Sequence, residues 1–266
     1  MAYNLQFKVL GRIEISTERD VSIMLKKSKT GQVLALLLAR NNETVGVDTL
    51  IEELWENRVP RSALTTLQTY VYHARKMFAR SLHVPCAEQL LITRPPGYLI
   101  SVPDDALDAT VFESFVKQGI AFLAAGNTEL AADRLTEALA LWQGPPFAGM
   151  PIGNVLNAHV TYLHELRLSA ITHHIEANKR LGRYPVLIPE LRSLVAANPL
   201  NEGFHSQLIE VLHKCGRRAE ALQAYQHLWR VLDAELGVQP APEVQRLHHE
   251  VLTHGRSAPA ATAYPV

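Results

Sequence analysis

The chain has little cysteine and no long apolar segment. Its two cysteines, Cys86 and Cys215, are far apart in 266 residues, and neither belongs to a CxxC pair. We therefore expect free thiols in a reducing compartment, used as small core residues. No window approaches the roughly eighteen apolar residues of a membrane span, and the first residues carry no apolar signal-peptide core. These absences predict a cytoplasmic protein without membrane contact.

The motifs of common catalytic sites are also missing. The chain has no GxSxG, no HExxH and no glycine-rich phosphate-binding loop. The doublets His173-His174 and His248-His249 place neighbouring side chains about 100° apart on a helix, so the members of a pair do not share a face. We therefore predict that the protein is not an enzyme and has no catalytic residue, cofactor or metal site.

Negative charge is absent from one segment. Residues 57–87 contain no Asp or Glu, although the net charge of the whole chain is zero. Residues 1–102 carry 13 Lys/Arg against 9 Asp/Glu, a net of +4, and residues 103–266 carry 13 against 17, a net of −4. A basic half joined to an acidic half predicts two domains, of which the first binds nucleic acid.

The segment without acidic residues has helical periodicity. Rotation by about 100° per residue gathers Leu64, Leu67, Val71, Ala74 and Phe78 into one apolar stripe. Polar, aromatic and cationic side chains occupy the rest of the surface. An ordinary amphipathic surface helix is the alternative, but such helices usually mix both signs of charge. The pattern therefore favours a helix that lies in a nucleic-acid groove.

The residues before this helix predict a small sheet and a first helix. Apolar residues alternate in short bursts over residues 5–25, which predicts three or four antiparallel strands. Ser28 can cap a helix over residues 29–40. Val45 and Val47 are expected to form a short extended piece, and Asp48 to cap a second helix over residues 49–55.

Pro60 then opens the long basic helix, and a hairpin follows it. Residues 91–100 contain two β-prone segments joined by Pro95-Pro96-Gly97, so Arg94 lies at the tip of the predicted hairpin. The order of sheet, three helices and hairpin predicts a winged helix-turn-helix domain over residues 1–102, with the hairpin as the wing. The aromatic residues Trp55, Tyr70 and Tyr98 are expected in its core.

Residues 103–252 are predicted to be entirely helical. Gly182 and Gly216 are 34 residues apart, which is the tetratricopeptide period, and Gly126 occupies the same place before an earlier helix. A long helix near residues 156–181 separates Gly126 from Gly182. We predict a degenerate tetratricopeptide-like bundle, with an unrelated helical bundle as the alternative, and we expect Trp142 and Trp229 at helix interfaces. Residues 253–266 are rich in Ala and Pro and are predicted to be disordered.

Helix-turn-helix docking assigns roles to the side chains of the basic helix. Its N-terminal part reaches base edges, and cations at its flanks hold phosphates. Arg94 is expected at the minor groove, although a solvated wing charge is the alternative. Arg75 lies nearer the buried stripe, and its alternative is a carboxylate partner inside the domain. The base-reading candidates are Thr65, Thr66, Gln68, Thr69, Tyr72 and His73, and the phosphate candidates are Arg58, Arg61, Arg75, Lys76 and Arg80.

Several short motifs resemble one bacterial family. They are Leu67-Gln68-Thr69-Tyr70-Val71, Arg75-Lys76, Pro96-Gly97-Tyr98, the segments ALALWQGP (138–145) and GRRAEAL (216–222), and AELGVQP (234–240). Together and in this order, they resemble the Streptomyces antibiotic regulatory protein family of transcriptional activators. The resemblance covers residues 5–252. It implies a mainly α fold with a small β part: an OmpR-type winged helix followed by an all-α bacterial transcriptional activation domain.

The resemblance also implies partners. Members of the family bind double-stranded promoter DNA at direct repeats near the −35 region, as two protomers side by side. They recruit RNA polymerase holoenzyme, including its sigma factor, and control antibiotic gene clusters. Two other functions stay open on the sequence: a tetratricopeptide-type adaptor without sequence-specific DNA binding, and a repressor that acts by occlusion.

Overall fold

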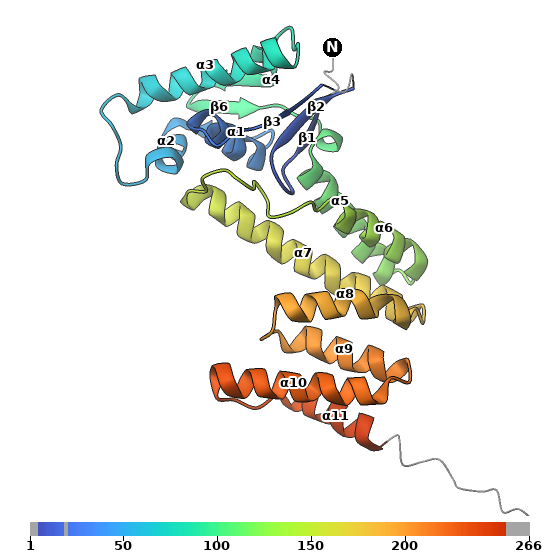
Figure 1. Ribbon diagram of the computed structural model, residues 1–266. Helices are drawn as coiled ribbons and strands as arrows, with labels where there is room; N and C mark the ends of the chain where they lie inside the picture. Colours follow the sequence, from blue (N-terminus) through green and yellow to red (C-terminus); the bar gives the residue numbers. More distant parts are fainter. Residues whose placement is uncertain (1–4, 19–20, 254–266) are drawn as a thin grey trace, which may run out of the picture. The chain divides into compact units, whose positions relative to one another are not determined.

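The N-terminal residues form the predicted antiparallel sheet. The computed structural model describes residues 5–18 and 21–253, and it begins with strands β1 (Leu5–Lys8), β2 (Glu14–Thr17) and β3 (Ser22–Met24) in the order β1-β2-β3 (Figure 1). Phe7 lies opposite Ile15, and both side chains are buried. Alternation with a period of two puts these apolar residues on one face, which is why the sheet could be predicted.

The first two helices begin differently. Helix α1 (Lys29–Ala39) starts as predicted, because the Ser28 hydroxyl accepts a hydrogen bond of 3.0 Å from the Gly31 N–H. Helix α2 (Val47–Trp55) has Gly46 as its cap residue, with no side-chain cap. The prediction that Asp48 caps this helix is therefore wrong. Strand β4 (Val45–Gly46) pairs with β6 (Gly97–Ile100) over two residues only. Val47, which was predicted to be extended, is therefore the first residue of α2, and Asp48 lies in the first turn of that helix.

Helix α3 (Ala63–Ser81), the short α4 (Ala87–Leu90) and the hairpin of β5 (Leu91–Arg94) and β6 complete a winged helix-turn-helix. The second sheet has the order β4-β6-β5. A Cβ atom at Gly97 would lie 1.8 Å from the Val45 carbonyl oxygen, so only glycine lets β4 approach the wing this closely. The predicted fold of this half is confirmed.

The described remainder, after a 3-10 turn at Asp104–Ala106, is helical. Gly126, Gly182 and Gly216 have φ of +80°, +70° and +73°, and each joins two consecutive helices. The recurrence of this left-handed turn matches the tetratricopeptide-like bundle predicted from the glycine spacing. The long inserted helix is α7. The helices are α5 (Asp108–Ala124), α6 (Thr128–Ala140), α7 (Asn154–Arg180), α8 (Tyr184–Ala197), α9 (Glu202–Lys214), α10 (Arg218–Leu236) and α11 (Pro242–Thr253).

Two compact units divide the chain between His174 and Ile175. In the first unit, one hydrophobic core runs from the winged helix through α5, α6 and the first part of α7. Four fully buried phenylalanines mark its extent: Phe7, Phe78, Phe112 and Phe147. The predicted disordered tail lies outside the described residues, except for Thr253, which ends α11.

Both cysteines and one tryptophan differ from their predicted burial. Cys86 is exposed and Cys215 is half-buried, so neither is the small core residue that was expected, although both thiols are free. Trp229 is 41% exposed, because α10 turns Leu228 and Leu232 inward and leaves Trp229 on its outer face. Trp142 lies at a helix interface as predicted, edge-on to Phe112. Among the described residues, no helix is long and apolar enough to cross a bilayer.

Candidate nucleic-acid interface

Helix α3 buries one face and exposes the other. Leu67, Val71, Ala74 and Phe78 are buried, as the periodicity predicted. The stripe does not begin at Leu64, however. Ala63 is only 4% exposed, whereas Leu64 is 50% exposed. The two positions lie on opposite edges of the stripe, about 100° apart. The side chain that is buried at the start of α3 is therefore the smaller one, that of Ala63.

The base-reading candidates lie on the outer face of α3. Five of the six are exposed, and Thr66 is half-buried. The Thr69 hydroxyl donates a hydrogen bond of 3.0 Å to the Thr65 carbonyl, so its donor is used within the helix and its methyl group is left for an outside contact. Tyr72 is 59% exposed, more than the other exposed large hydrophobic residue of the helix, Leu64. The exposed five are Thr65, Gln68, Thr69, Tyr72 and His73.

The cations of this surface have no carboxylate partners. Within residues 5–18 and 21–253, none of Arg58, Arg61, Lys76 and Arg80 forms an ion pair, whereas six arginines elsewhere do. The Lys76 ammonium instead lies 5.7 Å from the centroid of the Tyr72 ring. Unpaired cations beside exposed polar side chains give α3 a positive face that can bind phosphates.

Arg75 points to the wing. Its Nε and Nη2 donate hydrogen bonds of 2.9 and 2.7 Å to the Leu91 carbonyl, and Nη2 donates another of 2.8 Å to the Thr93 hydroxyl. The partner inside the domain is thus a backbone carbonyl and a hydroxyl rather than the carboxylate that was considered. This guanidinium joins the middle of α3 to strand β5. Arg94, the next residue along the wing, is exposed at the end of β5.

The helix-turn-helix angle is held by aromatic packing. Trp55 of α2 stacks on Tyr70 of α3, with ring centroids 6.2 Å apart and planes inclined by 26°. Both rings are partly buried against the core, and Tyr98 of β6 is buried. These three aromatics therefore pack inside the domain, as predicted, and the Trp55–Tyr70 stack joins α2 to α3.

Comparison with known families decides the identity. Residues 23–100 match the model of the C-terminal domain of transcriptional regulatory proteins, and residues 107–252 match that of the bacterial transcriptional activator domain. The chain belongs to the Streptomyces antibiotic regulatory protein family of transcriptional regulators. The resemblance found in the sequence motifs is thereby confirmed.

Named relatives span both halves of this family member. The regulatory protein DnrI of Streptomyces peucetius is 34% identical over 97% of this chain and 98% of its own length. The transcriptional regulator RedD of Streptomyces coelicolor is 31% identical over 93% of the chain and 70% of its own. The solved structure of Mycobacterium tuberculosis EmbR in complex with a low-affinity phosphopeptide has a TM-score of 0.84 at 30% identity, covering 97% of this chain and 67% of that one.

The buried carboxylate of Glu53 in this regulator was not predicted from the sequence. Glu53 of α2 is 2% exposed, and its carboxylate accepts hydrogen bonds from the N–H groups of Gly153 (2.7 Å), Val155 (3.0 Å) and Leu156 (3.0 Å). Glu53 therefore caps the start of α7, where the helix dipole favours a negative charge. The available signal was an acidic residue at an inward position, three residues after the buried Leu50.

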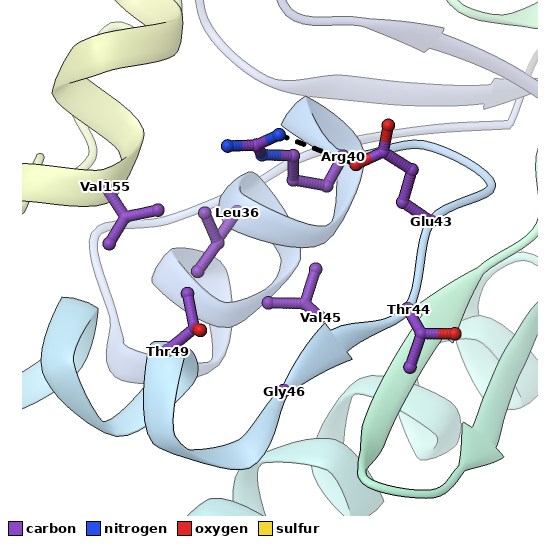
Figure 2. Close-up of a pocket in the computed structure, with 8 residues that line it drawn as sticks. All are labelled: Leu36, Arg40, Glu43, Thr44, Val45, Gly46, Thr49 and Val155. Atoms are coloured by element: carbon purple, nitrogen blue, oxygen red, sulfur yellow. Dashed lines mark ion pairs between the residues drawn. The ribbon is translucent and has the colours of Figure 1, made fainter.

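A small hollow lies beside this contact. Its volume is about 180 Å³, and Figure 2 shows Arg40 and Glu43 at its rim, with nitrogen and oxygen 3.5 Å apart. Burial and the nearby Arg40 charge lower the pKa of His159 in α7 to about 4. The pair at the rim is mutually neutralised, so the hollow offers no unpaired charge to a ligand. Its lining is Leu36, Arg40, Glu43, Thr44, Val45, Gly46, Thr49 and Val155.

Metal binding finds no support in the described part of the chain. No three His, Cys, Asp or Glu side chains gather there in a way that could hold an ion. Histidines of the first unit instead contact aromatic rings, as His159 does with Phe147 at 6.1 Å, or form hydrogen bonds, as His173 does with the Ser169 carbonyl at 2.7 Å.

Proposed function

We propose that this protein is a sequence-specific transcriptional activator that binds direct repeats near the promoter −35 region. Two protomers bind side by side, and DNA-bound protein recruits RNA polymerase holoenzyme through contacts that include the sigma factor. The relatives DnrI and RedD are named as regulators and come from Streptomyces, which supports a role in controlling an antibiotic gene cluster.

The observation that carries this proposal is the positive face of α3. Its cations lack carboxylate partners in the described chain, and exposed hydroxyl, amide and aromatic side chains lie among them. Six arginines elsewhere in the described chain do have a carboxylate partner, as in Arg134–Glu137 at 2.7 Å. A face kept positive in this way suits a polyanion.

Each group has a task in the proposed complex. Gln68 pairs with adenine, and the Thr65 and Thr69 methyl groups pack on thymine methyls. Thr66, Tyr72 and His73 complete the base-reading set. Arg94 enters the minor groove beside the wing, and Arg75 holds the wing against α3 through Leu91, besides its proposed phosphate role. The remaining phosphate contacts are assigned to Arg58, Arg61, Lys76 and Arg80.

The first experiment is a selection of genomic or random DNA by the purified full-length chain at two salt concentrations. A tandem motif with centres about 10–10.5 bp apart, together with affinity that falls steeply with salt, supports the proposal. Salt-sensitive binding without an enriched motif would favour the adaptor function instead. The full chain is used because the core of the winged helix continues into α5 and α7, so removal of residues 104–266 would expose it.

A matched pair of variants tests the phosphate role. Arg80→Ala should weaken binding equally on all sequences and reduce the slope of log affinity against log salt by about 1. Arg246→Ala removes an exposed arginine of α11 and should leave both values unchanged. Equal effects of the two variants would mean that net charge alone, rather than α3, binds DNA.

Transcription with purified holoenzyme on the selected promoter then separates activation from occlusion. We expect the wild-type chain to raise transcript yield, and Arg80→Ala to lose that gain unless its concentration is raised to restore occupancy. Repression at full occupancy would establish the occlusion alternative and overturn recruitment.

A further inference from the structure

Leu64 is a large apolar side chain left in solvent at the start of the recognition helix. It is 50% exposed and stands in the first turn of α3, while the neighbouring Ala63 is buried. A single exposed leucine is common on protein surfaces and means little by itself. The position of Leu64 is informative, because the N-terminal residues of a recognition helix are the ones that reach base edges.

We infer that Leu64 reads DNA sequence by contacting the 5-methyl group of a thymine in the major groove, an inference that rests on the proposed DNA-binding function. A leucine side chain has no hydrogen-bond donor or acceptor. The thymine methyl is the one apolar feature that the major-groove edges display, so it is the group that leucine can recognise. A cytosine there would turn its amino group toward leucine and lose a hydrogen bond to water.

The neighbours of Leu64 indicate where this thymine lies. Gln68 is one turn further along α3 and is also exposed. Side chains four residues apart are about 5–6 Å from each other, and base pairs follow every 3.4 Å or so. The thymine read by Leu64 is therefore expected one or two base pairs from the adenine that Gln68 contacts.

Thr65 and Thr69 also carry methyl groups toward this surface, so the contacts must be told apart. Thr65 lies about 100° from Leu64 around the helix axis, and Thr69 lies further round and one turn along. The three side chains therefore meet different base pairs. A test that removes one thymine methyl at a time can assign each of them.

The experiment measures binding of the full-length protein to duplexes in which single thymines of the selected half-site are replaced by deoxyuridine. This change deletes only the methyl group. Burial of one methyl contributes about a fourfold gain in affinity. Wild-type protein should lose about fourfold at one position near the Gln68 contact, and Leu64→Ala should remove that difference at the same position. Leu64→Met, which stays apolar, should preserve it.

Controls keep the result interpretable. Leu130→Ala removes a leucine of α6 that is 54% exposed, and it should bind every duplex as wild type does. Thr69→Ala should keep the thymine preference that Leu64→Ala loses. A thymine-to-deoxyuridine ratio in Leu64→Ala equal to that of wild type at every position would overturn the inference. Failure of the wild-type chain to select any motif would instead overturn the proposed function.

Discussion

The Glu53 carboxylate lies 2.7 Å from the Gly153 backbone nitrogen, which joins the helix-turn-helix to the first turn of α7 across 100 residues of sequence. The approach leaves no room for a side chain, because a Cβ at Gly153 would lie 2.7 Å from the Glu53 carbonyl oxygen. The Gln32 side-chain amide donates to the same carbonyl at 2.9 Å. The DNA-binding motif is thereby fixed to a helix of the activator domain by satisfied, buried polar groups.

Replacement of Glu53 by alanine should therefore be strongly destabilising. Three N–H groups at the start of α7 would lose their acceptor, two of them fully buried contacts. We expect a loss of about 3 kcal/mol in the free energy of unfolding, measured by urea denaturation. Glu52→Ala, at the exposed neighbouring position, should change it by less than about 0.5 kcal/mol. A similar small change in Glu53→Ala would show that the cap contributes nothing to stability.

The guanidinium of Arg75 should control the order of the wing. Arg75→Met keeps most of the apolar stem and removes three hydrogen bonds to β5, each worth about 1.5–3 kcal/mol when charge-assisted. Hydrogen exchange in residues 91–100 should accelerate, since β5 then loses its hydrogen bonds to α3. Arg80→Met, which removes a cation without such bonds, should leave exchange in the wing unchanged. Unaltered exchange in both variants would contradict a positioning role.

The inward face of α3 could be predicted because helical periodicity is a local property of the sequence. Leu67, Val71, Ala74 and Phe78 follow one another at spacings of 4, 3 and 4, and burial of such a stripe needs no knowledge of the partner. The wing could also be predicted from local sequence, because two β-prone segments flank Pro95-Pro96. Prediction failed at the first turn, where Ala63 is buried and Leu64 is exposed. The two positions lie on opposite edges of the stripe, and only the shape of the core decides which edge is covered.

Contacts between distant segments lay beyond the sequence. An acidic residue on α2 is expected to face water, and nothing near Glu53 indicates that residues 153–156 supply its hydrogen bonds. The Arg75 contact is similar, because its partner is a backbone carbonyl of the wing and a carbonyl has no signature in residue type. The structural role of a charged residue was thus hardest to predict where its hydrogen-bond partner is a backbone group.

Thr69 should affect specificity and leave stability almost unchanged. Its side chain is exposed, and its hydroxyl donates a hydrogen bond to the Thr65 carbonyl, so the methyl group is the part expected to contact a base. Thr69→Ala should lower discrimination at one base pair by about 1 kcal/mol and shift the melting temperature little, while Thr69→Val should keep the discrimination. A large drop in melting temperature for Thr69→Ala would place Thr69 in the core and refute the assignment of the two faces.

Two half-buried groups of the first unit should give opposite pH dependences. Burial raises the pKa of Asp108, which accepts hydrogen bonds from Val9 and Leu10, from 3.8 to about 6. The folded state then binds a proton that the unfolded state releases, so this group's contribution to stability falls as pH rises from 4 to 6. Burial lowers the pKa of His159 from 6.5 to about 4, so its contribution rises between pH 4 and 6.5.

Single variants should reveal the pH dependence of each group's contribution to stability, because the two contributions oppose each other in the wild-type chain. A shift of about two pKa units corresponds to a change on the order of 3 kcal/mol over the window. Relative to wild type, Asp108→Asn should gain stability as pH rises from 4 to 6, and His159→Gln should lose stability between pH 4 and 6.5. Urea denaturation at half-unit pH steps measures both, and subtraction of the wild-type curve removes every other titrating group. Parallel curves for a variant and wild type would mean that the substituted residue has the same pKa in the folded and unfolded states.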